Sequence, residues 1–108
     1  MSADVDFGEF RATVTVDPGT SGPNRIVMRV EESEPEAPQL AAVAFEASLT
    51  EPKLGPLKFD ATSAEHGVWS AEKAEFPIAG EWKVRVAARV GEFDLYVETI
   101  SIEIGGMS

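Results

Sequence analysis

The only histidine of the chain, His66, is the side chain best suited to acid–base or metal chemistry. It lies in the stretch AEHG, which has the composition of a turn, and Glu65 and Asp60 are the carboxylates that could join it. Copper(I) prefers thiolate or thioether ligands and copper(II) prefers imidazoles, but the chain has no cysteine, no histidine pair and no methionine-rich tract. We therefore expect no cofactor and no metal site, with His66 as the one candidate ligand.

Hydrolytic chemistry has no signature in this sequence. His66 can be combined on paper with several Ser and Asp residues, but no nucleophile elbow or oxyanion motif accompanies them. The 19 acidic residues bring carboxylates close together by chance, and the acidic run 31–38 has the composition of a solvated loop. Calcium-loop spacing and a glycine-rich phosphate loop are also missing from the sequence. We expect that this protein is not an enzyme.

Length and charge limit the class of protein. The chain has 108 residues, which suits a single domain over residues 1–108 with a core at about residues 9–104. Its 19 acidic and 9 basic residues give a formal charge of −10, which repels phosphate backbones and argues against nucleic acid as a partner. The first ten residues lack the basic and apolar regions of an export signal. We expect either a cytoplasmic chain or a piece of a longer exported protein.

Alternation of apolar and polar residues predicts strands along most of the chain. Phe10 begins the first clear alternation, and residues 1–8 read as a loose lead-in. Turn-forming stretches separate the strands, among them residues 51–56 and 63–67. The expected strands cover about residues 10–16, 25–31, 40–49, 57–61, 68–74, 82–90 and 93–104. This pattern predicts an all-β fold, an immunoglobulin-like antiparallel β-sandwich of about seven strands, with a small barrel as the alternative.

The last expected strand has two competing apolar sets. Phe93, Leu95 and Val97 share one parity, whereas three isoleucines from Ile100 onward share the other. One regular strand cannot bury both sets on the same face of a sheet. We therefore expect a β-bulge or bend between Val97 and Thr99.

The strand at residues 82–90 places large apolar and basic residues on opposite faces. Trp82 begins the apolar face, where we expect it to be core, although Trp82 and Trp69 together could also form a sugar-stacking platform. The other face carries a basic stripe, which we expect to pair with acids of neighbouring strands such as Asp94 or Glu98. Within that stripe, Arg89 is positioned to pair with Asp94 across the following turn. The basic stripe consists of Lys83, Arg85 and Arg89.

Two short patterns carry a resemblance to a known family. The run AGEWKVRVAARVGEFDLY contains a G-x-W turn, a strand that ends in arginine, and an F-D pair after a short turn. The matching residues are Gly80, Trp82, Arg89, Phe93 and Asp94. An earlier P-x-x-x-G-x-N element, with Pro18, Gly22 and Asn24, separates two strands, and Gly67-Val68-Trp69 forms a Gly-x-aromatic element. Over about residues 10–104, the chain resembles the C-terminal soluble domain of CopC/CopD-type copper transport proteins and the related YtkA-like and FixH-like domains.

The resemblance implies an extracytoplasmic role, periplasmic or at the cell surface. In longer relatives such a domain is attached to a multi-helix membrane segment and takes part in copper uptake or tolerance. The implied partners are the membrane segment of the same parent protein or a metallochaperone. We expect the pattern residues to determine the fold rather than to form a site. The alternative function is a carbohydrate- or protein-binding β-sandwich module unrelated to copper.

Overall fold

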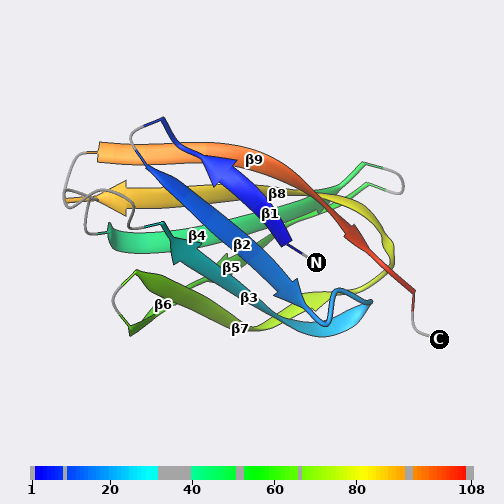
Figure 1. The fold of residues 1–108 in the computed structure, drawn as a ribbon. Helices are drawn as coiled ribbons and strands as arrows, with labels where there is room; N and C mark the ends of the chain where they lie inside the picture. Colours follow the sequence, from blue (N-terminus) through cyan, green and yellow to red (C-terminus); the bar gives the residue numbers. More distant parts are fainter. Residues whose placement is uncertain are drawn as a thin grey trace.

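The chain folds into two antiparallel β-sheets packed face to face (Figure 1). The computed structural model describes residues 2–8, 10–31, 40–50, 53–65, 67–91 and 94–106, and these residues form nine strands and no helix. The first sheet has the order β1-β2-β3-β7-β6, with β1 at Ser2–Asp6, β2 at Arg11–Asp17, β3 at Gly22–Val30, β7 at Val68–Phe76 and β6 at Thr62–Glu65. The second has the order β5-β4-β8-β9, with β5 at Leu54–Asp60, β4 at Leu40–Leu49, β8 at Gly80–Val90 and β9 at Asp94–Ile104.

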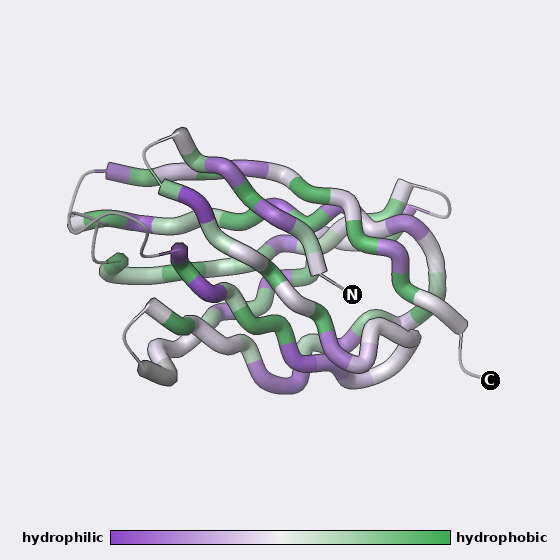
Figure 2. Tube along the Cα trace, viewed as in Figure 1, coloured by the Kyte–Doolittle hydropathy of each residue, from purple (hydrophilic) through white to green (hydrophobic). Residues whose placement is uncertain are grey.

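The all-β prediction is confirmed, and the strands of the described part of the chain do not close into a barrel. Figure 2 shows hydrophobic and hydrophilic residues alternating along the strands, as the sequence predicts. The inward residues of both sheets form a single core, because each sheet buries its apolar face against the other. No helix of the described residues is long and apolar enough to cross a membrane.

Two strands were not expected from the sequence. The presumed lead-in at residues 1–8 contains β1, whose Val5 is buried, and the following Phe7 is buried and stacks on Phe10 with ring centroids 4.7 Å apart. The presumed turn at residues 63–67 overlaps β6, a four-residue strand that pairs with β7. β5 also begins at Leu54, inside the stretch 51–56 that was expected to be a turn. Short strands rich in polar residues show little alternation of apolar and polar residues. Their turn-like composition therefore led to the prediction of loops and turns.

Trp82 is one of the large core side chains that have no exposed surface. Its ring packs edge-on against Phe76 of the opposite sheet, with centroids 5.2 Å apart. Its indole Nε1–H donates a hydrogen bond to the carbonyl oxygen of Ile78 at 3.0 Å, so the one polar atom of this buried side chain has a partner. The expected core position of Trp82 is confirmed.

The bulge expected between Val97 and Thr99 is absent. β9 pairs residue by residue with β8, from Gly80 opposite Ile104 to Val90 opposite Asp94, without a shift in register. The isoleucine set therefore faces the core, and Leu95 and Val97 lie on the outer face of the sheet, where Leu95 is 60% exposed. The strand therefore keeps its register, with Leu95 exposed and Val97 only partly buried on the outer face.

A bulge does occur in β7. Asn24 of β3 pairs with Ala74, and Ile26 pairs with Ala71, so β7 has one more residue than β3 across this step. Both alanines are buried although they have opposite parity. Lys73, between them, has a φ of 59°, the left-handed conformation that side chains with a Cβ disfavour. The bulge therefore returns Ala74 and Phe76 to the core face.

We predict that Lys73→Gly stabilises the fold, because glycine adopts positive φ without a steric penalty. The matched control is Lys73→Ala, which removes the same charge but keeps the Cβ. We expect the glycine variant to exceed the alanine variant by about 1 kcal/mol in the free energy of unfolding, measured with urea. Equal stability of the two variants would mean that residue 73 is not in the left-handed conformation.

Candidate functional site

The turn between β2 and β3 is organised by the side chain of Asn24. This residue is 4% exposed and is the only buried polar residue in the part of the chain that the structure describes. Its Oδ1 accepts a hydrogen bond from the Gly19 N–H at 2.7 Å, and its Nδ2 donates to the carbonyl oxygens of Thr20 and Gly22 at 2.8 and 2.9 Å. An amide fits this arrangement because it offers both one acceptor and two donors. The P-x-x-x-G-x-N element is therefore a turn held by its own asparagine.

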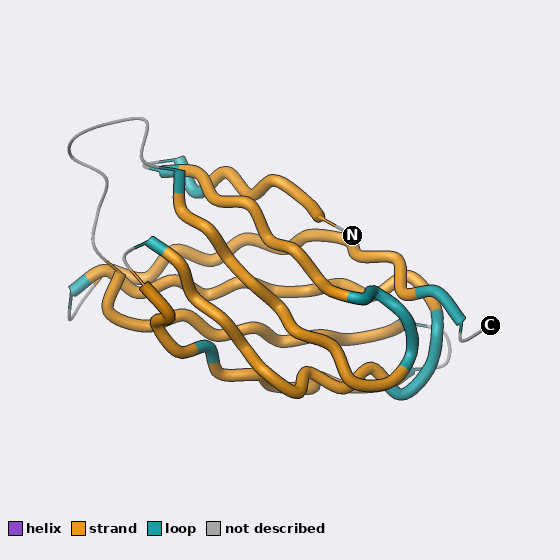
Figure 3. The backbone as a smooth tube through the Cα atoms, turned by 60° about the horizontal axis from the view of Figure 1, so that its bottom comes forward, coloured by secondary structure: helices purple, strands orange, loops and turns teal. Residues whose placement is uncertain are grey.

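The same turn joins the two sheets at one end of the sandwich. The Ser21 N–H donates to the Gly105 carbonyl at 2.8 Å, and the Gly105 N–H donates to the Gly19 carbonyl at 2.9 Å. These bonds form a short parallel bridge between Thr20 and Gly105, directly after β9. Figure 3 shows loop segments at this end of the molecule, where the C-terminus lies. Asn24 thus fixes the turn that receives the end of β9.

The G-x-W element has an equally structural role. Gly80 has a φ of 149°, and a Cβ at this position would lie 3.1 Å from Cδ1 of Leu49. The missing side chain lets Leu49 of β4 pack against the start of β8, two residues before Trp82 enters the core.

The two tryptophans do not form an exposed platform. Trp82 is fully buried, and Trp69 on β7 is partly buried and packed against the same core. Sugar stacking requires an accessible ring face, which Trp82 does not have. The pair therefore gives no support to the carbohydrate-binding alternative.

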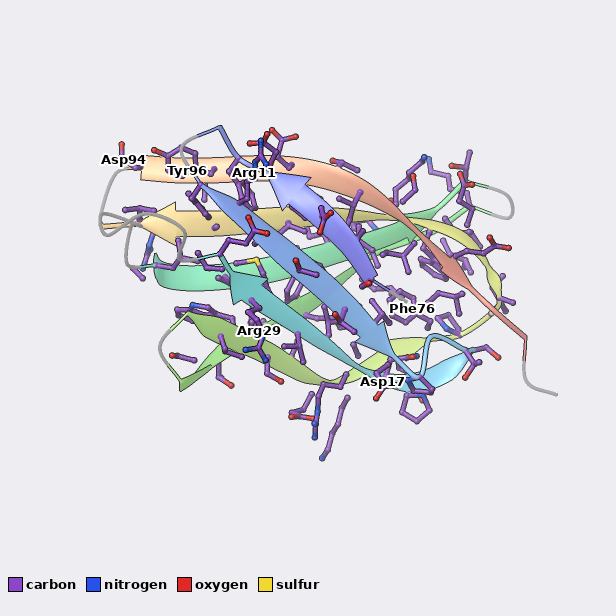
Figure 4. All side chains as sticks on the ribbon, viewed as in Figure 1. Arg11, Asp17, Arg29, Phe76, Asp94 and Tyr96 are labelled. Atoms are coloured by element: carbon purple, nitrogen blue, oxygen red, sulfur yellow. The ribbon has the colours of Figure 1, made fainter. Side chains whose placement is uncertain are left out.

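The predicted pairing of Arg89 with Asp94 is wrong. Register places Arg89 opposite Leu95 and Asp94 opposite Val90, so the two charged side chains lie on different faces of the sheet. Figure 4 shows Asp94 and Tyr96 at the start of β9, far from Phe76 at the other end of the molecule. His66, the candidate ligand, and Phe93 of the family pattern lie outside the residues that the structure describes.

The expected pairing of the basic stripe with acids of neighbouring strands is confirmed for Arg85, which pairs with Glu46 of β4, whereas the described partner of Lys83 is Glu81 of its own strand. Glu46 on β4 forms ion pairs with both Arg85, at 3.5 Å, and Lys58, at 3.7 Å. Lys83 lies 3.5 Å from Glu81 and donates to the Ser101 hydroxyl at 2.7 Å. These pairs are largely exposed, so each stabilises the fold by about 1 kcal/mol or less. Neither Asp94 nor Glu98 takes part in them.

An apolar groove lies between the edge strand β5 and the end of β7. It has a volume of about 750 Å³, and the charged side chains of Lys58 and Glu75 line it together with apolar residues and a glycine. The other lining residues are Gly22, Pro56, Leu57, Phe59 and Pro77. Among the described residues, no three His, Cys, Asp or Glu side chains come together in a way that could hold a metal ion.

Comparisons with models of protein families, with curated proteins and with solved structures gave no match to this chain. Of the residues in the two family patterns, Gly80 and Trp82 lie at the start of β8, while Gly22 and Asn24 lie at the start of β3. The sequence placed Asn24 in the pattern but did not reveal its role. The sequence did contain a sign of this role. Asn24 shares the inward face of its strand with apolar residues, and asparagine is rare in strands.

We predict that Asn24→Ala lowers the free energy of unfolding by about 1–3 kcal/mol, because it leaves one N–H and two carbonyl groups without their partner. Asn24→Asp should also destabilise, since a carboxylate accepts from Gly19 but cannot donate to Thr20 or Gly22. Chemical denaturation measures both effects.

The matched control lies in the same turn. Ser21→Ala removes a hydroxyl that forms no hydrogen bond with the described residues, so it should change stability by less than about 0.5 kcal/mol. If Asn24→Ala and Ser21→Ala are equally stable, the amide does not organise the turn.

Proposed function

We propose that the chain is a non-catalytic, extracytoplasmic accessory or interaction domain of a copper transport- or copper resistance-type membrane protein. The observation that carries this proposal is the agreement between the family patterns and two structural junctions. The P-x-x-x-G-x-N element forms the turn that receives the end of β9, and the G-x-W element begins β8. Because both patterns have a structural role in this fold, they support the same domain type as the resembled family more strongly than a match at single residues would.

The proposed domain type is an immunoglobulin-like sandwich, and the strand order supports it. In that fold, strands A, B, E and D form one sheet, and C, F and G form the other, with C′ added beside C in some members. The order β2-β3-β7-β6 corresponds to A-B-E-D, and β5-β4-β8-β9 corresponds to C′-C-F-G. β1 then adds one strand beside A.

The interaction role is supported by where the pattern residues lie. Gly80, Trp82 and Asn24 act inside the fold, so the pattern describes a scaffold rather than reacting groups. A scaffold of this kind presents edges and faces to a partner. The partners that fit the family resemblance are the membrane segment of the parent protein and a metallochaperone.

A second candidate is a protein-binding module unrelated to copper. The groove beside β5 favours it, because the apolar Leu57 and Phe59 line it together with charged side chains. Concave apolar surfaces with a few charged groups are common binding sites.

The proposed function is tested by removing residues 1–108 from the encoded protein in the source cells and measuring cellular copper and copper tolerance. We expect both to change, with recovery on re-expression of the intact domain and no recovery with the Asn24→Ala variant if it fails to fold. Unchanged copper content, with loss of the domain verified, would contradict the copper role and favour the unrelated binding module.

Copper titration of the isolated chain tests the expectation that the domain has no metal site of its own. We expect no submicromolar binding of Cu(I) or Cu(II), because the sequence offers no thiolates and only one imidazole. Submicromolar binding would contradict this expectation, and loss of that binding in His66→Ala would identify the ligand.

A further inference from the structure

The last strand, β9, has a free backbone edge. It pairs with β8 on one side, and no described strand pairs with it on the other (Figure 1). Gly105 directs both its N–H and its carbonyl away from β8, to Ser21 and Gly19. Alternate residues of a strand direct their backbone groups to the same edge. Residues two, four or more positions before Gly105 therefore direct their backbone N–H and carbonyl groups to the free edge. They are Leu95, Val97, Thr99, Ser101 and Glu103.

This edge lacks the features that normally prevent strand pairing. Edge strands are commonly protected by shortness, proline, lysine or bulges. β6 has four residues, β1 has five, and β5 contains Pro56 and a register shift against β4. β9 has eleven residues, an unbroken register with β8, and no Pro, Gly, Lys or Arg. Among the described edges, β9 is the long and regular one.

Side chains along β9 are incompletely covered. Ile100 faces the core opposite Val84, and Tyr96 faces it opposite Ala88, yet the β8 residues are fully buried while the β9 residues are only partly buried. β1 of the first sheet lies near β9, but no described strand continues the second sheet beyond β9. An added strand would cover Tyr96 and Ile100, and Leu95 on the outer face would gain an apolar neighbour.

Charge indicates what kind of strand fits. β9 carries Asp94, Glu98 and Glu103 and no basic residue, and the whole chain has a formal charge of −10. A second copy would bring the same acids and the same net charge against this edge, which costs free energy. Lys or Arg on the incoming strand would instead face the β9 carboxylates.

We propose that β9 is a strand-addition site for an extended segment of another polypeptide in which Lys or Arg alternates with β-branched or apolar residues. The segment pairs with the free edge from Leu95 to Glu103 and extends the second sheet by one strand. This proposal rests on the proposed interaction role but not on copper, and it names the part of the domain that engages the partner.

A synthetic peptide of about nine residues with alternating Lys and Val is a suitable probe, because this length matches a typical strand. Amide hydrogen exchange of the chain, followed by NMR, should show new protection at Val97, Thr99 and Ser101 when the peptide is added. The neighbouring amides of Glu98 and Ile100 already pair with β8, so their protection should change little.

Thr99→Pro tests the edge directly. It removes an N–H that points to the free edge and breaks no hydrogen bond with β8, so the fold should persist. We expect it to weaken peptide binding by about tenfold or more, whereas Thr99→Ala, which keeps the N–H, should bind as the parent chain does. Thermal unfolding of both variants verifies that they are folded.

A second peptide with the same lysines but with proline in place of valine separates strand pairing from charge attraction. Equal binding of the two peptides, or protection at amides away from β9, would overturn the proposal. Edge amides that become protected with rising concentration of the chain alone would also overturn it, in favour of a second copy. Failure of these tests would leave the copper measurements unaffected, so the two proposals can fail separately.

Discussion

The side-chain amide of Asn24 is the directional interaction on which one end of this sandwich depends. Apolar contacts between the sheets are non-directional, so they hold the layers together without fixing how the ends meet. Asn24 holds the turn at Gly19 and Thr20, and the backbone of that turn bonds to Gly105 after β9. Asn24 therefore helps to position Gly105 after the last strand, although 80 residues lie between the two in sequence.

The long strands could be predicted because their alternation covers several periods, as in the runs that begin at Phe10 and Trp82. Irregularity was harder to locate. A bulge was expected in β9, where two apolar sets compete, but it occurs in β7 beside Lys73. The sequence shows that a parity conflict exists, but it does not show whether a chain resolves it with an extra residue or by leaving one set in solvent.

Contacts between side chains depended on register, which alternation alone does not give. Arg89 and Asp94 are close in sequence across a short turn. The regular pairing of β8 with β9 nevertheless places their side chains on opposite faces of the sheet. Glu46, which receives two basic side chains, comes from β4 and is distant in sequence from one of them. The pattern residues were found from a resemblance, and their physical roles became clear only from the packing of Leu49 on Gly80 and the hydrogen bonds of Asn24.

The regular pairing of β9 with β8 also has a mechanical consequence. A force applied along β9 loads its hydrogen bonds with β8 in shear, so these bonds resist the force together. A force applied across the strand would instead open the pairs one after another. The bridge between Thr20 and Gly105 adds resistance at the end of the strand, because it ties that end to the other sheet. The domain is thus built to bear tension along its last strand better than tension across it.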